Sequence, residues 1–471
     1  MKTIFISAYN PFISRNILNT DVLNGLRKRP NLRIVILAPA NKTEFLKKYY
    51  EGENVVVEGV DAESVYRSAS NKFWYRLAFL LQNSQYVRDQ RGERLWRNRN
   101  ILGYLNYFWV SLWSAILSRI PLTRKAYRFF DYKFSSKSFF SEYFQKYSSS
   151  LVFSTDIFGE TDILLLREAK SRKILSVGMV RSWDNPTTKG ILRLIPDKII
   201  VNGLVAKEEL INFHDCKEKD ILVAGLPQFD NWLSGPTISR EDFFKKIGAD
   251  PAKRLILFAP AGSILSDTDW QLCQILKDAI NNGSLPDNIQ FLVRNHPHHP
   301  ADFSQFGEDP RFIFEVPGAR NNIQEVKLSE TGSSDKNDRL RNYAEFNPDD
   351  NDHLRNSVYY SDIVMYVATS LGLDAAVYDK PQIMISFDGW EKRPYVRSVR
   401  RFNREDCLAN LVKLGGTSVV TGKEDWIKLV NQYLKDPTLD GNGRKKIIER
   451  QMYKLDGKAG QRIAEAIIEL L

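Results

Sequence analysis

The chain has 471 residues, a formal net charge of +10 and only three cysteines, Cys216, Cys273 and Cys407. This length predicts two or three domains. The wide cysteine spacing excludes a disulfide framework and a zinc site, and it favours a reducing compartment such as the cytosol. Because no RNA- or DNA-binding signature accompanies the positive charge, we expect an anionic membrane surface or an anionic substrate as partner, and no nucleic acid.

Strand-like and helix-like segments alternate from the first residues onward. The opening apolar run, Lys2–Ala8, is a predicted strand; it is too short for a signal peptide and has no small-residue cleavage site, so we expect a cytoplasmic protein. Further strands are predicted at 32–38, 54–58, 151–154, 174–179, 198–202 and 221–224. Strands that alternate with helices form parallel sheets with both faces covered, so residues 1–235 are predicted to be a Rossmann-like domain.

Residues 70–147 interrupt this pattern with an aromatic and basic helical insertion. Within it, Ile101–Ile120 is nearly long enough to span a bilayer, has Arg119 as its only charge, and is flanked by arginine and lysine clusters. A crossing would place the two halves of one sheet on opposite sides of the membrane, so we expect no span. Two alternatives stay open: an interfacial helix that meets anionic lipid, and a buried helix or helix pair that covers the sheet.

A second alternating unit follows and is predicted to form another Rossmann-like domain at 236–440. Two strands that each run into a loop are predicted within 254–263 and 289–300, and further strands are predicted at 311–316, 362–367 and 382–386. Residues 317–350 are predicted to be an exposed insertion or a mobile loop. Closing helices are expected at 441–471. The predicted fold class is therefore α/β, with two doubly wound domains and a helical insertion in the first.

The segment "MYVATSLGLDAAVYDKP" places two hydroxyls where a strand passes into a helix. If Ser370 caps that helix, the free N–H groups of the first turn and the helix dipole make an anion site, and Thr369 and Ser370 would hold phosphate. Asp374 lies one turn later on the same face and would accept hydrogen bonds from ribose hydroxyls. The alternative is an ordinary helix cap with no ligand and a solvated Asp374.

Two other strands of the second unit also end in candidate ligand loops. "RNHPHHP" follows a predicted strand, and Arg294 with His296 could clamp a phosphate, with His296 also a candidate proton donor. Two prolines stiffen this loop and no acidic ligand accompanies it, so we expect no metal; a surface loop with chance histidines is the alternative. In "FAPAGS", the small residues Pro260, Gly262 and Ser263 would let the backbone approach a phosphate.

Two carboxylates follow strands of the first unit. Asp156, in "STDIFGETD", and Asp184, in "SWDNPTTKG", are placed to act as a general base on an acceptor hydroxyl. Structural roles are the alternatives: a helix cap for Asp156 and a turn-former beside Asn185-Pro186 for Asp184.

The strand–Arg-x-His-Pro loop and the later "DIVMYVATSLGLDAAVYDKPQI" together resemble the C-terminal half of GT-B glycosyltransferases. The resemblance is strongest over 195–390. Within that superfamily it is nearest to CDP-glycerol glycerophosphotransferases, UDP-N-acetylglucosamine 2-epimerases and transferases of bacterial surface polysaccharides. It implies two Rossmann-like domains that face across a cleft, with the acceptor on the first and a nucleotide donor on the second. The implied donor-binding residues are Pro260, Gly262, Ser263, Arg294, His296, Thr369, Ser370 and Asp374, with Asp156, Asp184 and His296 as candidate catalytic residues.

The chain also departs from these relatives. It lacks the Gly-Gly loop of several of them, the Asp-Tyr-Ser-Ser run of the glycerophosphotransferases and an assignable acidic set like that of the epimerases. The leading hypothesis is a metal-independent glycosyltransferase without a cofactor, which moves a sugar from a nucleotide-sugar to a lipid-linked or surface-glycan acceptor at the cytoplasmic membrane face. The alternatives are a CDP-glycerol-type phosphotransferase or a UDP-sugar 2-epimerase at the same site, and a non-catalytic GT-B-like binding protein.

Overall fold

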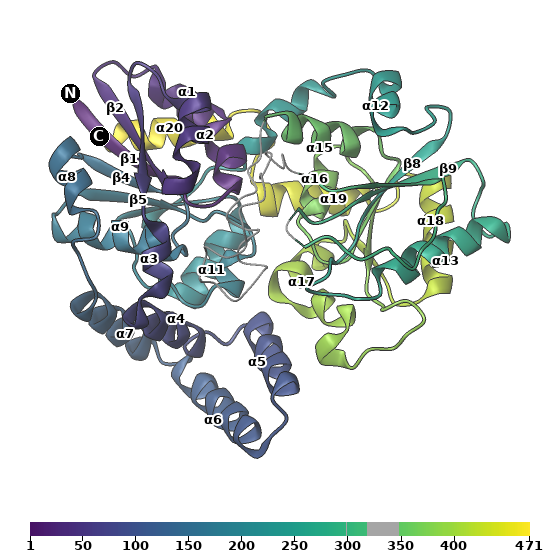
Figure 1. Ribbon diagram of the computed structural model, residues 1–471, viewed down its shortest axis with the longest axis horizontal. Coiled ribbons are helices and arrows are strands. Elements are labelled where there is room, and N and C mark those ends of the chain that lie inside the picture. Colours follow the sequence, from purple (N-terminus) through teal and green to yellow (C-terminus); the bar gives the residue numbers. More distant parts are fainter. Residues whose placement is uncertain (298, 318–347) are drawn as a thin grey trace. The chain divides into compact units, whose positions relative to one another are not determined.

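The computed structural model describes residues 1–297, 299–317 and 348–471 (Figure 1). They form two compact units: unit 1 comprises Met1–Asn231 and Glu449–Leu471, and unit 2 comprises Trp232–Ile448. His298 and nearly all of the predicted insertion at 317–350 lie outside the described residues.

Unit 1 contains a seven-stranded sheet in the order β3-β2-β1-β4-β5-β6-β7, and every neighbouring pair is parallel. Its strands are β1 (Lys2–Ser7), β2 (Leu32–Pro39), β3 (Val55–Val60), β4 (Leu151–Ser154), β5 (Leu175–Met179), β6 (Lys198–Val201) and β7 (Ile221–Val223). Alternate residues enter different cores: Ile4 and Ile6 pack in one, and Phe5 packs in the other. Because both faces are covered, the strands are nearly continuous apolar runs, as expected of a parallel sheet.

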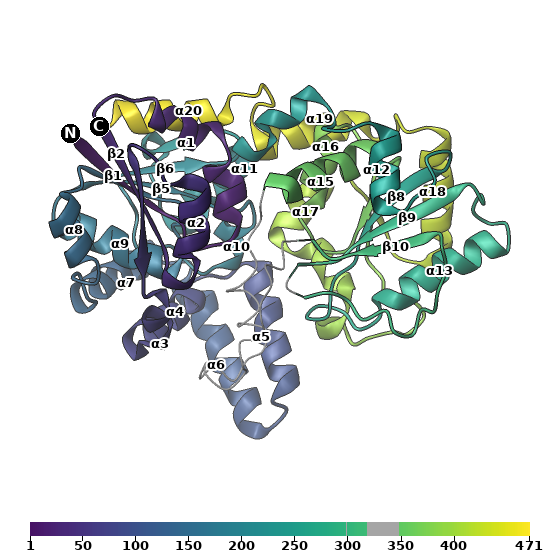
Figure 2. The same ribbon diagram turned by 45° about the horizontal axis from the view of Figure 1, so that its top comes forward.

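Helices cover both faces of this sheet. They include α1 (Asp21–Arg27), α2 (Thr43–Tyr50), α9 (Glu160–Ser171), α10 (Asn185–Thr188) and α11 (Leu204–His214). The C-terminal helix α20 (Ala459–Glu469) packs beside α1 (Figure 2) and contributes Ile463 and Ile467 to the core. A Cβ added to Gly25 would lie 2.8 Å from the Ala464 Cβ, so these two helices need a glycine to approach this closely.

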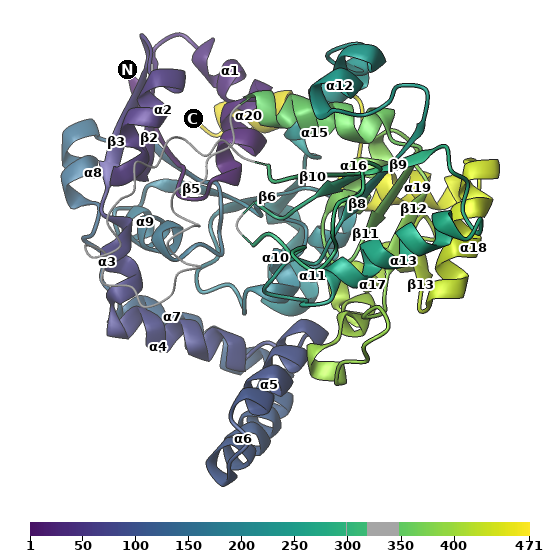
Figure 3. The same ribbon diagram turned by 45° about the vertical axis from the view of Figure 1, so that its right-hand side comes forward.

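The predicted insertion consists of helices. They are α4 (Ala69–Leu80), α5 (Gln85–Arg97), α6 (Ile101–Leu117), α7 (Pro121–Phe134) and α8 (Ser141–Tyr147), and a further helix, α3 (Ala62–Arg67), precedes the predicted range. The expected continuous helix 101–120 is instead interrupted after Leu117, and Pro121 begins α7, since proline fits the first turn of a helix but not its interior. Figures 1 and 3 show α5 and α6 side by side as a hairpin that projects from α4 and α7.

No single helix in the described part of the chain is long and apolar enough to cross a membrane. Together, Ile101–Leu117 and Pro121–Phe134 meet the length and composition criterion, but they are bent by 104°. The alternative of a buried helix is wrong for α6 within this chain, because Ser114 is the only buried residue of its 17.

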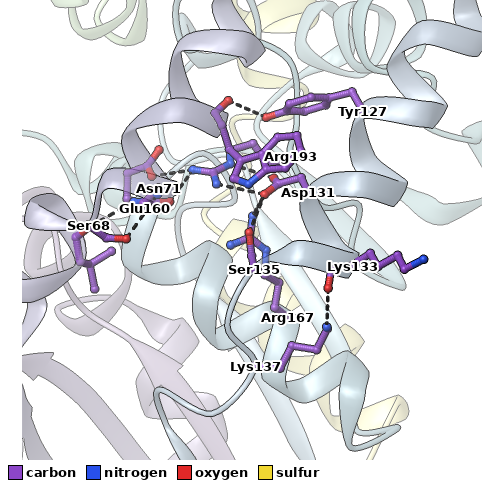
Figure 4. A network of polar contacts seen from close by, with 12 residues as sticks. Ser68, Asn71, Tyr127, Asp131, Lys133, Ser135, Lys137, Glu160, Arg167 and Arg193 are labelled. Carbon is purple, nitrogen blue, oxygen red and sulfur yellow. Dashed lines mark hydrogen bonds and ion pairs between the residues drawn. The ribbon is translucent and has the colours of Figure 1, made fainter.

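Buried charges fix the base of the helical insertion (Figure 4). Arg193 donates from Nε to Asp131 at 3.0 Å and from Nη1 to Glu160 at 2.6 Å, and Arg167 Nη2 lies 2.5 Å from Asp131. Arg193 Nη1 also donates to the Asn71 side chain at 2.7 Å. These contacts join α4, α7 and α9, and each buried charge has an opposite charge beside it.

Unit 2 contains a six-stranded parallel sheet in the order β10-β9-β8-β11-β12-β13. Its strands are β8 (Arg254–Ala259), β9 (Ile289–Arg294), β10 (Phe312–Glu315), β11 (Ile363–Tyr366), β12 (Gln382–Ile385) and β13 (Ser418–Val420). The covering helices are α12 (Arg240–Ile247), α13 (Asp269–Asn281), α15 (Pro348–Tyr360), α16 (Leu371–Val377), α17 (Asp406–Lys413), α18 (Lys423–Lys435) and α19 (Gly441–Ile447). The expected pair of doubly wound α/β domains is confirmed.

Candidate functional site

Each sheet has a switch point where the strand order reverses. It lies between β1 and β4 in unit 1 and between β8 and β11 in unit 2. Ligands of open α/β sheets bind outside the carboxyl ends of the strands at this point. The loops that follow β1, β4, β8 and β11 are therefore the places to look for a site in each unit.

In unit 2 the loop after β8 is held by a buried carboxylate, Asp269, at the start of α13. Asp269 accepts hydrogen bonds from the N–H groups of Ala261 at 3.1 Å and Gly262 at 2.9 Å. Burial raises the pKa of Asp269 to about 6, although these two hydrogen bonds oppose the shift. The loop containing the predicted Pro260, Gly262 and Ser263 is thus preorganised by its own helix.

The same loop lies against the loop that follows β9. Ser263 N–H donates to the His299 carbonyl at 3.3 Å. Gly262 has φ +82°, and a Cβ there would lie 2.3 Å from that carbonyl oxygen, so only glycine fits. The exposed His296 ring stacks on His299, with 5.3 Å between centroids. The structure thus brings Gly262, Ser263 and His296 together, as the prediction of a shared site requires.

Arg294, the last residue of β9, contacts a carboxylate rather than standing free. It forms an ion pair with Glu315 at the end of the neighbouring strand β10, and His353 Nε2 of α15 lies 2.6 Å from the other Glu315 oxygen. Burial opposes the ionisation of Glu315, but Arg294 and His353 outweigh it and lower its pKa. A phosphate role for Arg294 stays a prediction, and it requires the guanidinium to serve Glu315 as well.

The segment after β11 has the predicted strand-to-helix form. Thr369 and Ser370 are half-buried immediately before α16, and Ser370 occupies the N-cap position without a side-chain capping bond. A Cβ on Gly372 would lie 2.5 Å from the Tyr366 hydroxyl, so this glycine lets α16 pack directly on β11. Asp374 is 5% exposed, which excludes the alternative of a solvated carboxylate.

A cavity of about 290 Å³ opens beside Ser263 in unit 2. Its lining includes Asp267, Asp269, Trp270, Asp302, Gln305, Glu391 and Arg393. Carboxylates repel phosphate oxygens but accept hydrogen bonds from sugar hydroxyls, and an indole ring can pack on a sugar face. The chemistry of this cavity therefore suits hydroxyl groups better than phosphate.

In unit 1 the switch point contains a buried carboxylate that sequence reasoning did not select, Asp162. Its Oδ1 accepts hydrogen bonds from the hydroxyls of Ser154 at 2.9 Å and of Ser7, the last residues of β4 and β1. Burial, followed by the charge of Asp156, raises the pKa of Asp162 to about 7, against the opposing effect of its hydrogen bonds. A carboxylate with this pKa can take up and release a proton near neutral pH.

Asp156, a predicted base, lies directly after β4 and Thr155. Its Oδ2 accepts a hydrogen bond from Arg181 Nε at 2.7 Å, and its Oδ1 accepts from the Phe158 N–H at 3.2 Å. Gly159 holds the N-cap position of α9, so the alternative of a helix cap is wrong for Asp156. Asp156 is therefore held by Arg181 and by the backbone of its own loop.

Asp184, the other predicted base, organises its own loop. It accepts hydrogen bonds from Ser182 and, at 3.0 Å, from Thr188 Oγ1, and it precedes the short helix α10. Both contacts are local, which matches the turn-forming alternative. A catalytic role for Asp184 stays a prediction with no further contact to support it.

Two more polar groups lie at the carboxyl edge of this sheet. The Tyr9 hydroxyl, two residues after β1, and both amide atoms of Asn202, directly after β6, are buried and have no hydrogen-bond partner among the described residues. Burial and the charge of Asp162 raise the pKa of Tyr9 well above its ordinary value, so its hydroxyl keeps its proton and can donate. Buried groups of this kind are commonly satisfied by a ligand or by water.

Sequence reasoning missed Asp162, Arg181, Asp269 and Glu315. The first and third share a usable signal: an aspartate in the first turn of the helix that follows a glycine-containing strand-end loop. The other two are recognised only through partners distant in sequence. Among the described residues, no group of three or more His, Cys, Asp or Glu side chains is arranged to hold a metal ion.

Comparisons with known proteins identify the fold. No family model matches the sequence, and none of the curated proteins matches it. Solved structures do match. The S. aureus MnaA–UDP complex has a TM-score of 0.55 at 11% identity, over 100% of this chain and 98% of that one. The UDP-GlcNAc 2-epimerase from Methanocaldococcus jannaschii gives 0.52 at 12% identity, over the whole of both chains.

The wall teichoic acid polymerase TagF also matches, with a TM-score of 0.52 at 13% identity over 99% of this chain and 88% of that one. All of these are GT-B fold proteins. The expected resemblance is therefore confirmed at the level of fold: the chain has a two-domain α/β architecture that matches these GT-B proteins.

Proposed function

We propose that the protein is a glycosyltransferase that uses a nucleotide-sugar donor. The observation that carries the proposal is the preorganised β8 loop at the switch point of unit 2, where Asp269 holds the loop and Gly262 lies against the His299 carbonyl. Similar folds solved with nucleotide ligands support it: one is a complex with UDP, and another is bound to UDP-GlcNAc.

The donor diphosphate would lie on the β8 loop and the start of α16. The hydroxyls of Thr369 and Ser370 and the imidazole of His296 would supply hydrogen-bond donors to the diphosphate. The small residues of the β8 loop would let its backbone lie close to the ligand, while the N–H groups of Ala261, Gly262 and Ser263 bond to Asp269 and His299. Asp374 would contact the ribose. The hydroxyl-compatible cavity beside Ser263 would receive the sugar of the donor.

In the proposed reaction, an acceptor hydroxyl attacks the anomeric carbon of the sugar. The bond from that carbon to the phosphate oxygen breaks, and the nucleoside diphosphate leaves with the electron pair. The hydroxyl proton passes to a carboxylate of unit 1. Asp162, whose pKa is raised to about 7, is the leading candidate for this base, and Asp156 is the alternative. Hydrogen-bond donors of the protein that contact the diphosphate stabilise the negative charge that develops on it, and His296 can protonate it. The proposed acceptor is lipid-linked or a surface glycan.

A sugar 2-epimerase is the second candidate, because buried carboxylates at the switch point of unit 1 could also remove a proton from a sugar carbon. A CDP-glycerol-type phosphotransferase would use the same donor loops, and the comparisons include TagF after a CDPG soak. Product analysis separates the three. An epimerase converts the nucleotide-sugar without an acceptor, a phosphotransferase releases a nucleoside monophosphate, and a glycosyltransferase releases a diphosphate.

The experiment is a thermal-shift screen of the full chain with UDP, CDP, GDP and ADP, followed by turnover of the matching nucleotide-sugars. We expect at least one diphosphate to raise the melting temperature, and Thr369→Ala with Ser370→Ala to reduce the shift. Ser284→Ala is the matched control, since it removes an exposed hydroxyl before β9, at the opposite edge of the same sheet. No shift with any nucleotide would refute the proposal; a shift without turnover by any donor would indicate a non-catalytic binding protein.

A further inference from the structure

Helix α6 exposes apolar side chains around most of its circumference. Ile101 is 80% exposed, Leu102 75%, Phe108 58%, Trp109 51% and Trp113 49%. The other exposed apolar residues of the helix are Tyr104, Leu105, Tyr107, Leu112 and Ile116. A contiguous apolar surface of this kind is unusual on a monomer in water and marks a place where another apolar phase or molecule binds.

Positive charge surrounds this apolar surface. Gln85–Arg119 contains six arginines and two acidic residues, Asp89 and Glu93, which gives a formal net charge of +4. Arg94, Arg97 and Arg99 are exposed around the turn between α5 and α6, and Arg119 is exposed beyond the other end of α6. Figures 1 and 3 place that turn at the far end of the hairpin.

Helix α6 is too short to cross a bilayer. Its 17 residues span about 25 Å, compared with about 30 Å for the hydrocarbon layer. Its aromatic residues are Tyr104, Tyr107, Phe108, Trp109 and Trp113; tryptophan and tyrosine concentrate at the membrane–water interface. An apolar, aromatic helix beside arginines has the composition of an interfacial helix on anionic lipid.

The hairpin is attached to unit 1 by polar contacts rather than by a flexible linker. The Arg91 guanidinium donates to the carbonyls of Phe79 and Gln82 and, at 2.7 Å, to Ser114 Oγ, the one buried residue of α6. On α7, Arg124 and Arg128 both pair with Asp215, at 2.5 and 3.0 Å. These bonds keep α7 on the domain and orient α6 before any partner arrives, which lowers the entropic cost of docking.

We propose that the α5–α6 hairpin, Gln85–Leu117, is a docking surface for an anionic phospholipid bilayer. The apolar side chains of α6 enter the boundary between headgroups and acyl chains, and the arginines at the turn contact lipid phosphates. The purpose of docking, which is to bring the enzyme to a lipid-linked acceptor, rests on the proposed function. The test of docking involves no sugar transfer.

The test is co-sedimentation of the full chain with vesicles of phosphatidylcholine, with and without phosphatidylglycerol. We expect binding to the anionic vesicles that weakens as salt is added. Replacing Trp109→Ser and Trp113→Ser together should weaken binding at least tenfold. Replacing Arg94, Arg97 and Arg99 by Gln should weaken it about fivefold per arginine.

A matched control removes three exposed positive charges elsewhere: Lys423→Gln, Lys428→Gln and Lys435→Gln on α18. This variant should bind as the wild type does. To test the hairpin with its surface nearly intact, Asn106→Cys on α6 can carry an environment-sensitive dye, since the native cysteines are buried. We expect a blue shift of its emission on anionic vesicles only.

Three results would overturn the proposal: no binding of the wild type to anionic vesicles, equal binding of the tryptophan variant, or no blue shift of the dye. A second copy of the chain is the competing occupant. The second copy would be favoured if the wild type is a dimer in lipid-free buffer, the tryptophan variant is a monomer, and neither binds vesicles. The nucleotide thermal shift should be unchanged in all hairpin variants, so failure of docking is distinguishable from failure of the donor site.

Discussion

The two sheets have the same kind of switch point but differ in the side chains that accompany the buried carboxylate at each carboxyl edge. In unit 1, the strands end in buried carboxylates: Asp162 is hydrogen-bonded to two serines, and Asp156 is paired with Arg181. In unit 2, the buried Asp269 accepts from the N–H groups of its own β8 loop, and the half-buried hydroxyls of Thr369 and Ser370 follow β11. The difference suggests a division of labour in which unit 1 accepts a proton and unit 2 holds an anion.

The largest effect should come from the carboxylate of unit 1. Asp162→Asn keeps the size of the side chain and can still accept from the serines, but it cannot take up a proton. We expect the transfer rate to fall by about 10²- to 10⁴-fold with unchanged nucleotide affinity. The measurement is kcat beside a nucleotide titration. Loss of nucleotide affinity in this variant would contradict the division of labour between the two units.

Stability should depend strongly on the buried ion network of unit 1. Arg193→Met removes the cation beside the buried Glu160 and one of the two cations beside Asp131, and we expect the free energy of unfolding to fall by about 3–5 kcal/mol. Arg97→Met removes an exposed i,i+4 pair and is the control, with an expected cost below about 1 kcal/mol. Denaturant unfolding measures both. A similarly small loss of unfolding free energy in the two variants would contradict the importance of the buried ion network for stability.

The pH dependence of stability should identify Asp162. Its folded-state pKa is about 7, above the 3.8 of an ordinary aspartate, so its contribution is complete below about pH 4 and is lost as the pH rises through 7. Asp162→Asn avoids this loss. The variant should gain about 2–4 kcal/mol relative to the wild type between pH 4 and 8. A difference in unfolding free energy that stays constant with pH would exclude a neutral, buried Asp162.

In unit 2, Gly262→Ala should weaken nucleotide binding by about tenfold and cost about 1–3 kcal/mol of stability. The added Cβ meets the His299 carbonyl, and alanine disfavours φ +82°. Gly283→Ala is a matched control, because Gly283 also has positive φ but nothing lies within 4 Å of an added Cβ. Calorimetric titration compares the two. Equal nucleotide affinity of the two variants would show that the β8 loop is not part of the nucleotide site.

Strand positions were predictable because parallel strands are continuous apolar runs; β8 and β9 form the first parts of the predicted strand-and-loop segments 254–263 and 289–300. The end of α6 at Leu117 was not predicted, although Pro121 marks it. The partners of charged groups could not be predicted from the sequence either. Arg294 pairs with Glu315 only because β10 lies beside β9, and Asp162 contacts Ser7 across 155 positions of sequence. Asp374 was correctly placed near the start of a helix, but its burial depends on tertiary packing.

The central claim is that unit 2 binds the nucleoside diphosphate at its switch point. Amide hydrogen exchange of the full chain, with and without the diphosphate selected by thermal shift, tests it most directly. We predict slower exchange in 261–266 and 368–373, and unchanged exchange in 282–288 at the opposite edge of the same sheet. Protection confined to unit 1, or no protection in the β8 and β11 loops at saturating nucleotide, would contradict the claim.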